Sequence, residues 1–152
     1  MEIERKWRLK TIPPHLTVNP PQQFTQGYIL TWPVELRVRT DEKKSWLTVK
    51  SDGELSRDEW ENEIPAWVFE QLFGSVAHYL EKSRYTPTIN LQTWELDVFH
   101  GPLTGLVLVE AECSSEAEIA NLVLPEIFGE SYEVTHDIYY KNKHLAIYGI
   151  SE

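Results

Sequence analysis

Residues 1–10, MEIERKWRLK, set the pattern that decides the fold. Their charged side chains recur at every second position, at Glu2, Glu4, Lys6 and Arg8. Apolar side chains fill most of the positions between them, and Arg5 is the exception. Because successive side chains of a β-strand point to opposite faces, this spacing predicts a strand with one charged face and one apolar face.

The rest of the chain continues in short strand-like segments. Segments rich in β-branched and aromatic residues lie near 2–10, 24–31, 34–41, 45–51, 58–64, 78–86, 93–100 and 104–113. Helices are expected at 66–73, at 115–123 and from about 136 to 147. Some eight strands joined by short turns predict a mainly β protein of the α+β class, an antiparallel barrel or sandwich with a few peripheral helices.

Length and composition limit the possible functions. With 152 residues, 41% of them hydrophobic, the chain can bury one core, so we expect a single domain over residues 1–152. The net charge of -10 disfavours nucleic-acid binding, since a phosphate backbone needs a basic face. Neither a membrane helix of ~20 apolar residues nor a signal peptide is evident, and the single cysteine, Cys113, suits a reducing compartment. We therefore expect a cytoplasmic protein with no membrane partner.

Charges along the predicted strands are sorted by sign. Bases occupy one face at Lys6, Arg37, Arg39, Lys50, Lys82 and Arg84. Acids do so at Glu2, Glu4, Glu59, Glu61, Glu63, Glu95, Asp97, Glu110 and Glu112. Any one of these faces could be an ordinary solvated surface, but like charges stacked along a strand repel, so the repeated sorting indicates a ligand. A sheet closed with these faces inward would form a polar tunnel for a small molecule.

The charge balance of this inward face predicts a metal. Its six bases and nine acids give -3, which by itself repels a polyanion, and two divalent cations would bring the balance to +1. Clustered carboxylates are the hard oxygen ligands that Mg²⁺ or Mn²⁺ prefers, and no Cys/His cluster indicates zinc. Mg²⁺ or Mn²⁺ is therefore the expected cofactor.

An ordered series of short motifs runs through the charged strands. It comprises Glu2-Ile3-Glu4-Arg5-Lys6, Gln26-Gly27-Tyr28, Arg37-Val38-Arg39, Leu47-Thr48-Val49-Lys50, the stretch from Arg57 to Pro65, Lys82-Ser83-Arg84-Tyr85, Trp94-Glu95-Leu96-Asp97 and Glu110-Ala111-Glu112. In this order, over nearly the whole chain, the motifs resemble those of the CYTH domains, or triphosphate tunnel metalloenzymes. The resemblance implies an eight-stranded antiparallel β-barrel tunnel that binds a triphosphate group.

Roles for the charged residues follow from the tunnel and the resemblance together. Metal ligands are expected at Glu2, Glu4, Glu110 and Glu112, with Glu61, Glu63 or Asp97 completing the shell. Phosphate contacts are expected from Lys6, Arg37, Arg39, Lys50, Lys82 and Arg84. Catalytic roles are expected for Lys6, Arg39 and Tyr28. The alternative for any one charge is a salt bridge within the tunnel, and for Tyr28 it is packing.

One position departs from the family pattern. A basic residue is usual where Tyr139 stands, and Lys141 or Lys143 is the candidate replacement.

Similarity to the short bacterial members favours hydrolysis of inorganic tripolyphosphate to diphosphate and phosphate, with a small-molecule triphosphate as the ligand. A thiamine triphosphatase or a class IV-like adenylate cyclase is the alternative, although no adenine pocket is evident. A non-catalytic polyphosphate-binding module is a further alternative, weakened because both candidate metal pairs are intact. The oligomeric state is left open.

Overall fold

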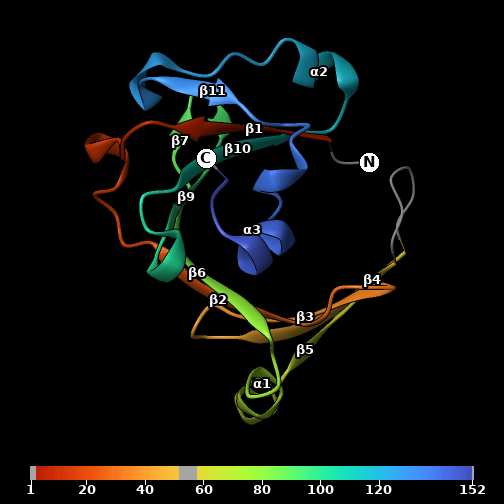
Figure 1. Cartoon of the computed structure of the whole chain (residues 1–152). Helices are drawn as coiled ribbons and strands as arrows, with labels where there is room; N and C mark the ends of the chain where they lie inside the picture. Colours follow the sequence, from red (N-terminus) through yellow and green to blue (C-terminus); the bar gives the residue numbers. More distant parts are fainter. Residues whose placement is uncertain (1–2, 52–57, 152) are drawn as a thin grey trace.

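The structure is a computed structural model that describes residues 3–51 and 58–151 (Figure 1). Its main feature is one antiparallel sheet of nine strands in the order β11-β1-β10-β9-β6-β2-β3-β4-β5. These strands are β1 (Ile3–Leu9), β2 (Gln22–Leu30), β3 (Val34–Thr40), β4 (Ser45–Ser51), β5 (Glu59–Ile64), β6 (His78–Tyr85), β9 (Glu95–Phe99), β10 (Val107–Cys113) and β11 (Ser131–Glu133). A separate small hairpin pairs β7 (Thr88–Ile89) with β8 (Gln92–Thr93).

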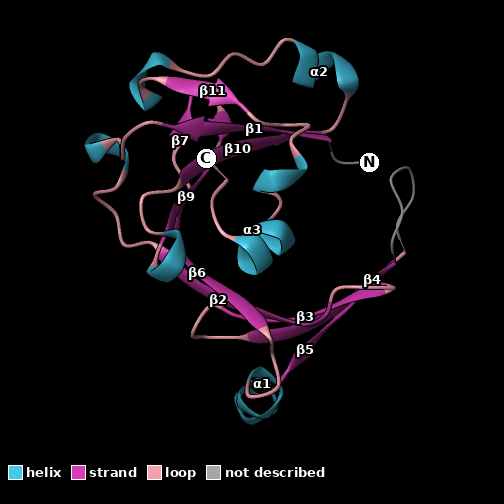
Figure 2. Cartoon of the chain, viewed as in Figure 1, coloured by secondary structure: helices cyan, strands magenta, loops and turns pink. Residues whose placement is uncertain are grey.

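The helices are short and lie on both faces of the sheet (Figure 2). They are α1 (Ala66–Phe73), α2 (Glu116–Ala120) and α3 (Asn142–Tyr148), with 3₁₀ turns at Pro14–Leu16, Gly101–Leu103, Glu126–Phe128 and Ile138–Tyr140. The Ser115 side chain caps α2 by accepting a hydrogen bond of 3.1 Å from the Glu118 backbone N–H. None of the helices in the described part of the chain is long and apolar enough to cross a membrane.

The prediction of a mainly β antiparallel fold with a few helices is confirmed, and each predicted strand and helix has a counterpart. The three-residue strand β11 was not predicted, because it is too short to show a periodicity. The sheet also differs from a closed barrel, since β11 and β5 are its two edges. It bends around α3 instead, so that its concave face encloses the C-terminal segment (Figure 1).

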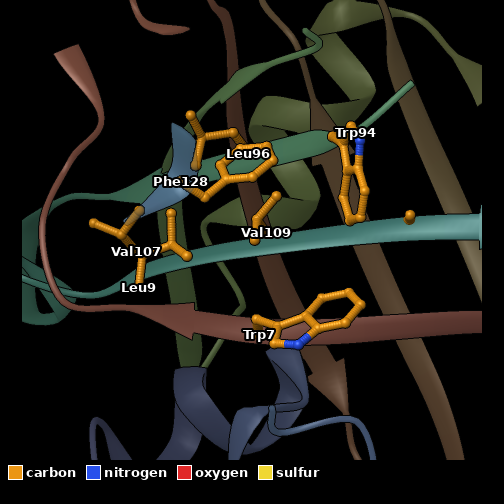
Figure 3. Packing of buried hydrophobic residues seen from close by; sticks show 8 residues of the cluster. Trp7, Leu9, Trp94, Leu96, Val107, Val109 and Phe128 are labelled. Atoms are coloured by element: carbon orange, nitrogen blue, oxygen red, sulfur yellow. The ribbon is translucent and has the colours of Figure 1, made fainter. Parts of the chain in front are cut away.

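The apolar sides of β1, β9 and β10 form a hydrophobic cluster on the face turned away from α3 (Figure 3). The rings of Trp7 and Trp94 meet edge to face with centroids 5.8 Å apart, and Phe128 packs on Trp94 at 5.5 Å. The other buried members are Leu9, Leu96, Val107, Val109 and Ala111. The alternation in the sequence predicted this outward apolar face correctly.

The concave face is divided between an apolar end and a charged end. Leu80 of β6 and Leu108 of β10 pack at one end against Leu145 of α3. Two residues further along these strands, Lys82 and Glu110 lie on the same face by alternation. Helix α3 therefore rests on the apolar end and leaves the charged end for the site.

Strand β2 is held closely between the site and α1, which packs on the convex face. At Gly27 of β2, a Cβ atom would lie only 2.7 Å from Cγ1 of Val76 and 3.0 Å from the ring of Phe73. Glycine thus permits the close approach of the segment after α1. The neighbours Gln26 and Tyr28 consequently face the concave side.

Strand β1 is bound on both sides by segments from late in the chain. It pairs with β10 on one side and β11 on the other. Beyond β11, the Val134 backbone N–H donates to the Lys6 carbonyl at 2.8 Å, and the Lys6 backbone N–H donates to Thr135 Oγ1 at 3.0 Å. These bonds place Lys6 next to the C-terminal segment.

Candidate active site

A polar cavity of about 620 Å³ lies between β1, strands β2 to β4 and the C-terminal segment. Five of the predicted site residues line it: Glu4, Lys6, Tyr28, Arg37 and Lys50. The other lining residues are Glu35, Ser51, Thr135, His136, Ile138, Lys141, Asn142 and Lys143. The strand alternation thus brought together charged residues that are up to 46 positions apart in the sequence, from Glu4 to Lys50.

Two arginines on β3 carry unsatisfied donors: Arg37, which is buried and lines the cavity, and Arg39, which is partly buried and does not line it. Arg37 Nη1 lies 3.8 Å from the Glu35 carboxylate. Nε of Arg37 and Nε of Arg39 are buried and have no hydrogen-bond partner within the described part of the chain. The Arg39 guanidinium lies over the rings of Phe24 at 5.0 Å and Trp46 at 5.4 Å. Burial and the neighbouring Arg37 lower its pKa. A buried donor without an acceptor costs free energy, so this pair suits an anionic ligand.

The bases on β6 have closer protein partners. Lys82 Nζ lies 2.9 Å from one carboxylate oxygen of Asp97, and Arg84 donates to both Asp97 oxygens at 2.8 and 3.0 Å. Arg84 also pairs with Glu95. Burial alone raises the pKa of Asp97, but Lys82 and Arg84 outweigh it and hold the pKa at about 2. The structure therefore places Asp97 in a buried ion cluster with these two bases.

Carboxylates gather where β1 meets β10. Glu4 and Glu112 are direct partners in the register, and Lys6 Nζ lies 3.7 Å from Glu110. Burial raises the pKa of Glu110 to about 7; Lys6 opposes this shift, whereas the negative charges of Glu4 and Asp97 add to it. Two opposed carboxylates beside Glu110, whose pKa is raised, fit a bound cation, which would relieve their repulsion.

The remaining predicted metal ligands differ in position. Glu2 lies outside the described residues. On the edge strand β5, Glu61 accepts a hydrogen bond of 3.1 Å from Thr48 Oγ1, and Glu63 lies 3.6 Å from Lys44 Nζ. Neither lines the cavity. Among residues 3–51 and 58–151, no group of three or more His, Cys, Asp or Glu side chains is already arranged around one point as a metal site would require.

Tyr28 lies at the bottom of the cavity and is almost completely buried, with 1% of its surface exposed. Its Oη accepts a hydrogen bond of 2.9 Å from Nε2 of Gln26, which is equally buried. Burial raises the pKa of Tyr28 to about 12, so the phenol keeps its proton at neutral pH. Gln26 was not predicted as a site residue, although its position two residues before Tyr28 places it on the same strand face.

The C-terminal segment supplies two further bases. Lys141 and Lys143 both line the cavity. Tyr139, at the position where the family usually has a base, is half-exposed and packs on the ring of His144 with centroids 4.8 Å apart. Asp137 caps this turn by accepting a hydrogen bond of 2.9 Å from the Tyr139 backbone N–H. Both lysines are thus positioned to replace the missing base.

Known proteins similar to this chain are triphosphatases. The chain is 41% identical over 150 residues to an inorganic triphosphatase of Nitrosomonas europaea, covering 96% of this chain and 97% of the relative. It is 35% identical to an inorganic triphosphatase of Acetivibrio thermocellus over 127 residues, which cover 81% of this chain and 79% of the relative. The crystal structure of the inorganic triphosphatase NE1496 matches with a TM-score of 0.76 and 38% identity, covering 97% of this chain and 95% of that one. A scan against protein-family models finds no match.

The curved antiparallel sheet, the charged concave face and these relatives define the class as the triphosphate tunnel, or CYTH, enzymes. Within that class the chain belongs to the inorganic triphosphatase family. The resemblance seen in the ordered sequence motifs is confirmed.

Proposed function

We propose that this chain hydrolyses inorganic tripolyphosphate to diphosphate and phosphate in the cavity lined by Lys6, Arg37 and Lys50. The observation that carries the proposal is the pair of buried Nε donors of Arg37 and Arg39, which have no acceptor within the described residues. Phosphate oxygens match a guanidinium in charge and geometry. The names of the two relatives point to the same substrate.

The proposed metal is Mg²⁺ or Mn²⁺, held by Glu4, Glu110 and Glu112, with Glu2 as a further ligand. The opposed register of Glu4 and Glu112 and the raised pKa of Glu110 support this choice, because carboxylate oxygens are the ligands that these hard cations prefer. When bound, such an ion polarises phosphate oxygens and lowers the pKa of a coordinated water. Glu61 and Glu63 remain candidates for a second ion on the β5 side.

The bases divide into two groups in this proposal. Arg37 and Lys50 bind the phosphates from the cavity wall, and Lys6 joins them from β1 across the cavity. Arg39, two residues after Arg37 on the same face of β3, binds from beside them. Lys82 and Arg84 contribute positive potential from beneath the site while Asp97 fixes their positions. We therefore propose that Asp97 holds these two bases in place and does not bind the metal.

Tyr28 and Arg39 act on the transferred phosphoryl group. A protonated phenol can donate a hydrogen bond to a phosphate oxygen, and the Arg39 guanidinium offsets the charge that develops there. The aromatic rings on either side of Arg39 fix the plane of the guanidinium before substrate arrives.

The test is phosphate release from tripolyphosphate, thiamine triphosphate and ATP, each with Mg²⁺, Mn²⁺ or a chelator, with cyclic AMP measured in the ATP reactions. We expect tripolyphosphate to be cleaved best, only with metal, and Glu4→Ala to be inactive. Glu70→Ala, an exposed change on α1 at the convex face, is the matched control and should retain full activity. Faster cleavage of thiamine triphosphate, cyclic AMP formation, or tight binding of tripolyphosphate without turnover would each replace the proposal with one of the alternative functions.

A further inference from the structure

Gln26 is the donor and Tyr28 the acceptor of the hydrogen bond between them, and this determines where the Tyr28 proton can point. Gln26 Nε2 donates to Tyr28 Oη at 2.9 Å, and both side chains are 1% exposed. A phenol oxygen has one proton to donate and two lone pairs that accept. Gln26 occupies one of these lone pairs, so the phenol proton cannot point toward Gln26.

Arg37 acts on the same phenol from the neighbouring strand. It is the cross-strand partner of Tyr28 in the register of β2 and β3. Its guanidinium lowers the pKa of Tyr28 both as a positive charge and as a hydrogen-bond donor, against the larger effect of burial. With donors on two sides, the Tyr28 proton is left for a third group.

That third group can only come from the cavity. Tyr28 lines the cavity together with Arg37 and Lys50, and the Tyr28 hydroxyl donates to no acceptor within the described residues. Phosphate oxygens accept hydrogen bonds, whereas the basic side chains on this wall cannot, and the one carboxylate next to them on β3, Glu35, pairs with Arg37 at 3.8 Å. The buried phenol is therefore oriented toward an anionic ligand.

The surroundings of the Gln26 amide oxygen also support a hydrogen bond in which the amide nitrogen donates to Tyr28. Gln26 Oε1 is buried and has no hydrogen-bond donor within the described residues. Its cross-strand partner in β3 is Arg39, a partly buried cation. A carbonyl oxygen is stabilised by a nearby positive charge, whereas an amide N–H₂ group is repelled by it. The amide group is accordingly stable with its nitrogen, not its oxygen, toward Tyr28.

From these contacts we infer that Gln26 is a positioning residue, which donates to Tyr28 Oη and thereby directs the phenol proton into the cavity toward a phosphate oxygen. This inference rests on the proposed triphosphatase function and adds a residue to its machinery. Gln26 itself does not line the cavity. Its effect must therefore pass through the Tyr28 hydroxyl.

A double-mutant cycle tests that dependence. We expect Gln26→Leu to lower kcat for tripolyphosphate about tenfold, and Tyr28→Phe to lower it about a hundredfold. In the Tyr28→Phe background, Gln26→Leu should cause no further fall, because the hydroxyl that it orients is gone. An equal fall in both backgrounds, or no fall in the wild type, would overturn the inference.

Gln26→Glu tests the direction of the hydrogen bond with almost no change of shape. A carboxylate accepts from the phenol instead of donating to it, so kcat should fall at least as far as in Gln26→Leu. Near-normal activity of Gln26→Glu would contradict the assigned direction. The matched control is Gln23→Leu, the same change on the opposite face of β2, where Gln23 accepts from Ser83 and lies away from Tyr28. It should leave kcat unchanged.

Tripolyphosphate binding, measured by calorimetry with a chelator present, separates this inference from the proposed function. We expect Gln26→Leu to weaken binding about threefold in the wild-type background and not in the Tyr28→Phe background. If the wild type binds but does not hydrolyse tripolyphosphate, the proposed function is wrong. The double-mutant cycle, measured by binding affinity, then still decides the role of Gln26. Thermal unfolding of each variant verifies that it is folded.

Discussion

Lys82 and Arg84 on β6 and Arg37 and Arg39 on β3 have the same two-residue spacing on the same concave face, yet their surroundings are opposite. The β6 pair shares the carboxylate of Asp97 through contacts of 2.8 to 3.0 Å. The β3 pair retains buried Nε donors without acceptors in the described residues, and Arg37 has only the longer contact of 3.8 Å with Glu35. Charge neutralised by the protein supports the fold, and charge left without an acceptor is available to a ligand. The comparison predicts opposite effects of mutations in the two regions.

The largest expected effect is on activity, from Arg39→Met. Methionine keeps the packing between Phe24 and Trp46 but removes the charge. We expect kcat for tripolyphosphate to fall about a thousandfold, as when a preorganised charge is removed from a transition state. The free energy of unfolding should stay the same or rise by about 1 kcal/mol, since Arg39 is a partly buried cation with no ion pair to the described residues.

Steady-state kinetics and urea unfolding of the same preparation verify both parts. Lys10→Met, on an exposed base that pairs with Glu130, is the control and should change neither quantity. A strongly destabilised Arg39→Met protein would mean that Arg39 supports the fold as Lys82 and Arg84 do.

The β6 side should respond in the opposite way. Asp97→Asn leaves the buried charges of Lys82 and Arg84 without their shared counter-ion. We expect a loss of about 3 to 5 kcal/mol in the free energy of unfolding, measured in urea. Glu130→Gln, which breaks the exposed pair with Lys10, should cost less than about 1 kcal/mol. If Asp97→Asn lowers the free energy of unfolding no more than Glu130→Gln does, the buried ion cluster adds nothing to stability.

Glu110 on β10 lies next to the β6 region, 3.9 Å from Arg84, and predicts how stability changes with pH. Its pKa is about 7 in the folded protein, mainly through burial, against an ordinary value of 4.5. The folded state therefore holds this proton more tightly than the unfolded state. Without metal, stability should fall by about 3 kcal/mol as pH rises from 4.5 through 7.

Mg²⁺ should reverse this trend, because a cation replaces the proton at the carboxylates and binds more tightly as Glu110 ionises. Thermal unfolding between pH 4.5 and pH 8, with Mg²⁺ or with a chelator, measures the effect. Glu110→Gln should remove most of the dependence in both conditions. A wild-type profile that Mg²⁺ does not alter would argue against a metal at Glu110.

The smallest expected effect concerns the C-terminal bases. Lys141 and Lys143 line the cavity from the turn before α3 and from α3 itself, so they should bind phosphate in place of a base at Tyr139. We expect Lys143→Met and Lys141→Met each to raise KM about three- to tenfold with little change in kcat. Tyr139→Lys in the double variant should restore part of the affinity. No change in KM for either lysine would leave substrate binding to the strands alone.

Strand alternation predicted much of this arrangement because a period of two is visible in sequence. It placed Lys6, Arg37 and Lys50 on one face, and all three line the cavity. It also predicted the outward cluster around Trp7 and Trp94. The ordered motifs identified the family because they follow one another in the family's order over nearly the whole chain.

Pairing across strands could not be predicted in the same way. Asp97 and Glu110 have the same alternating context, yet Asp97 meets two bases at 2.8 and 2.9 Å. Glu110 lies farther from its bases, 3.7 Å from Lys6 and 3.9 Å from Arg84, and feels other carboxylates. Which charges meet depends on the order and stagger of the strands, and that information is not local. Open sheet edges and the position of α3 are likewise properties of tertiary packing.

The bonds between β1 and the segments from late in the chain have a consequence for synthesis. During translation, β1 is made well before its neighbours β10 and β11 and the Lys6 partners Val134 and Thr135, which lie about a hundred or more residues further along the chain. Until then β1 is an unpaired strand with one charged face, which limits its tendency to associate with other nascent chains. Such long-range pairing should also make refolding slow compared with that of a helical protein of similar size.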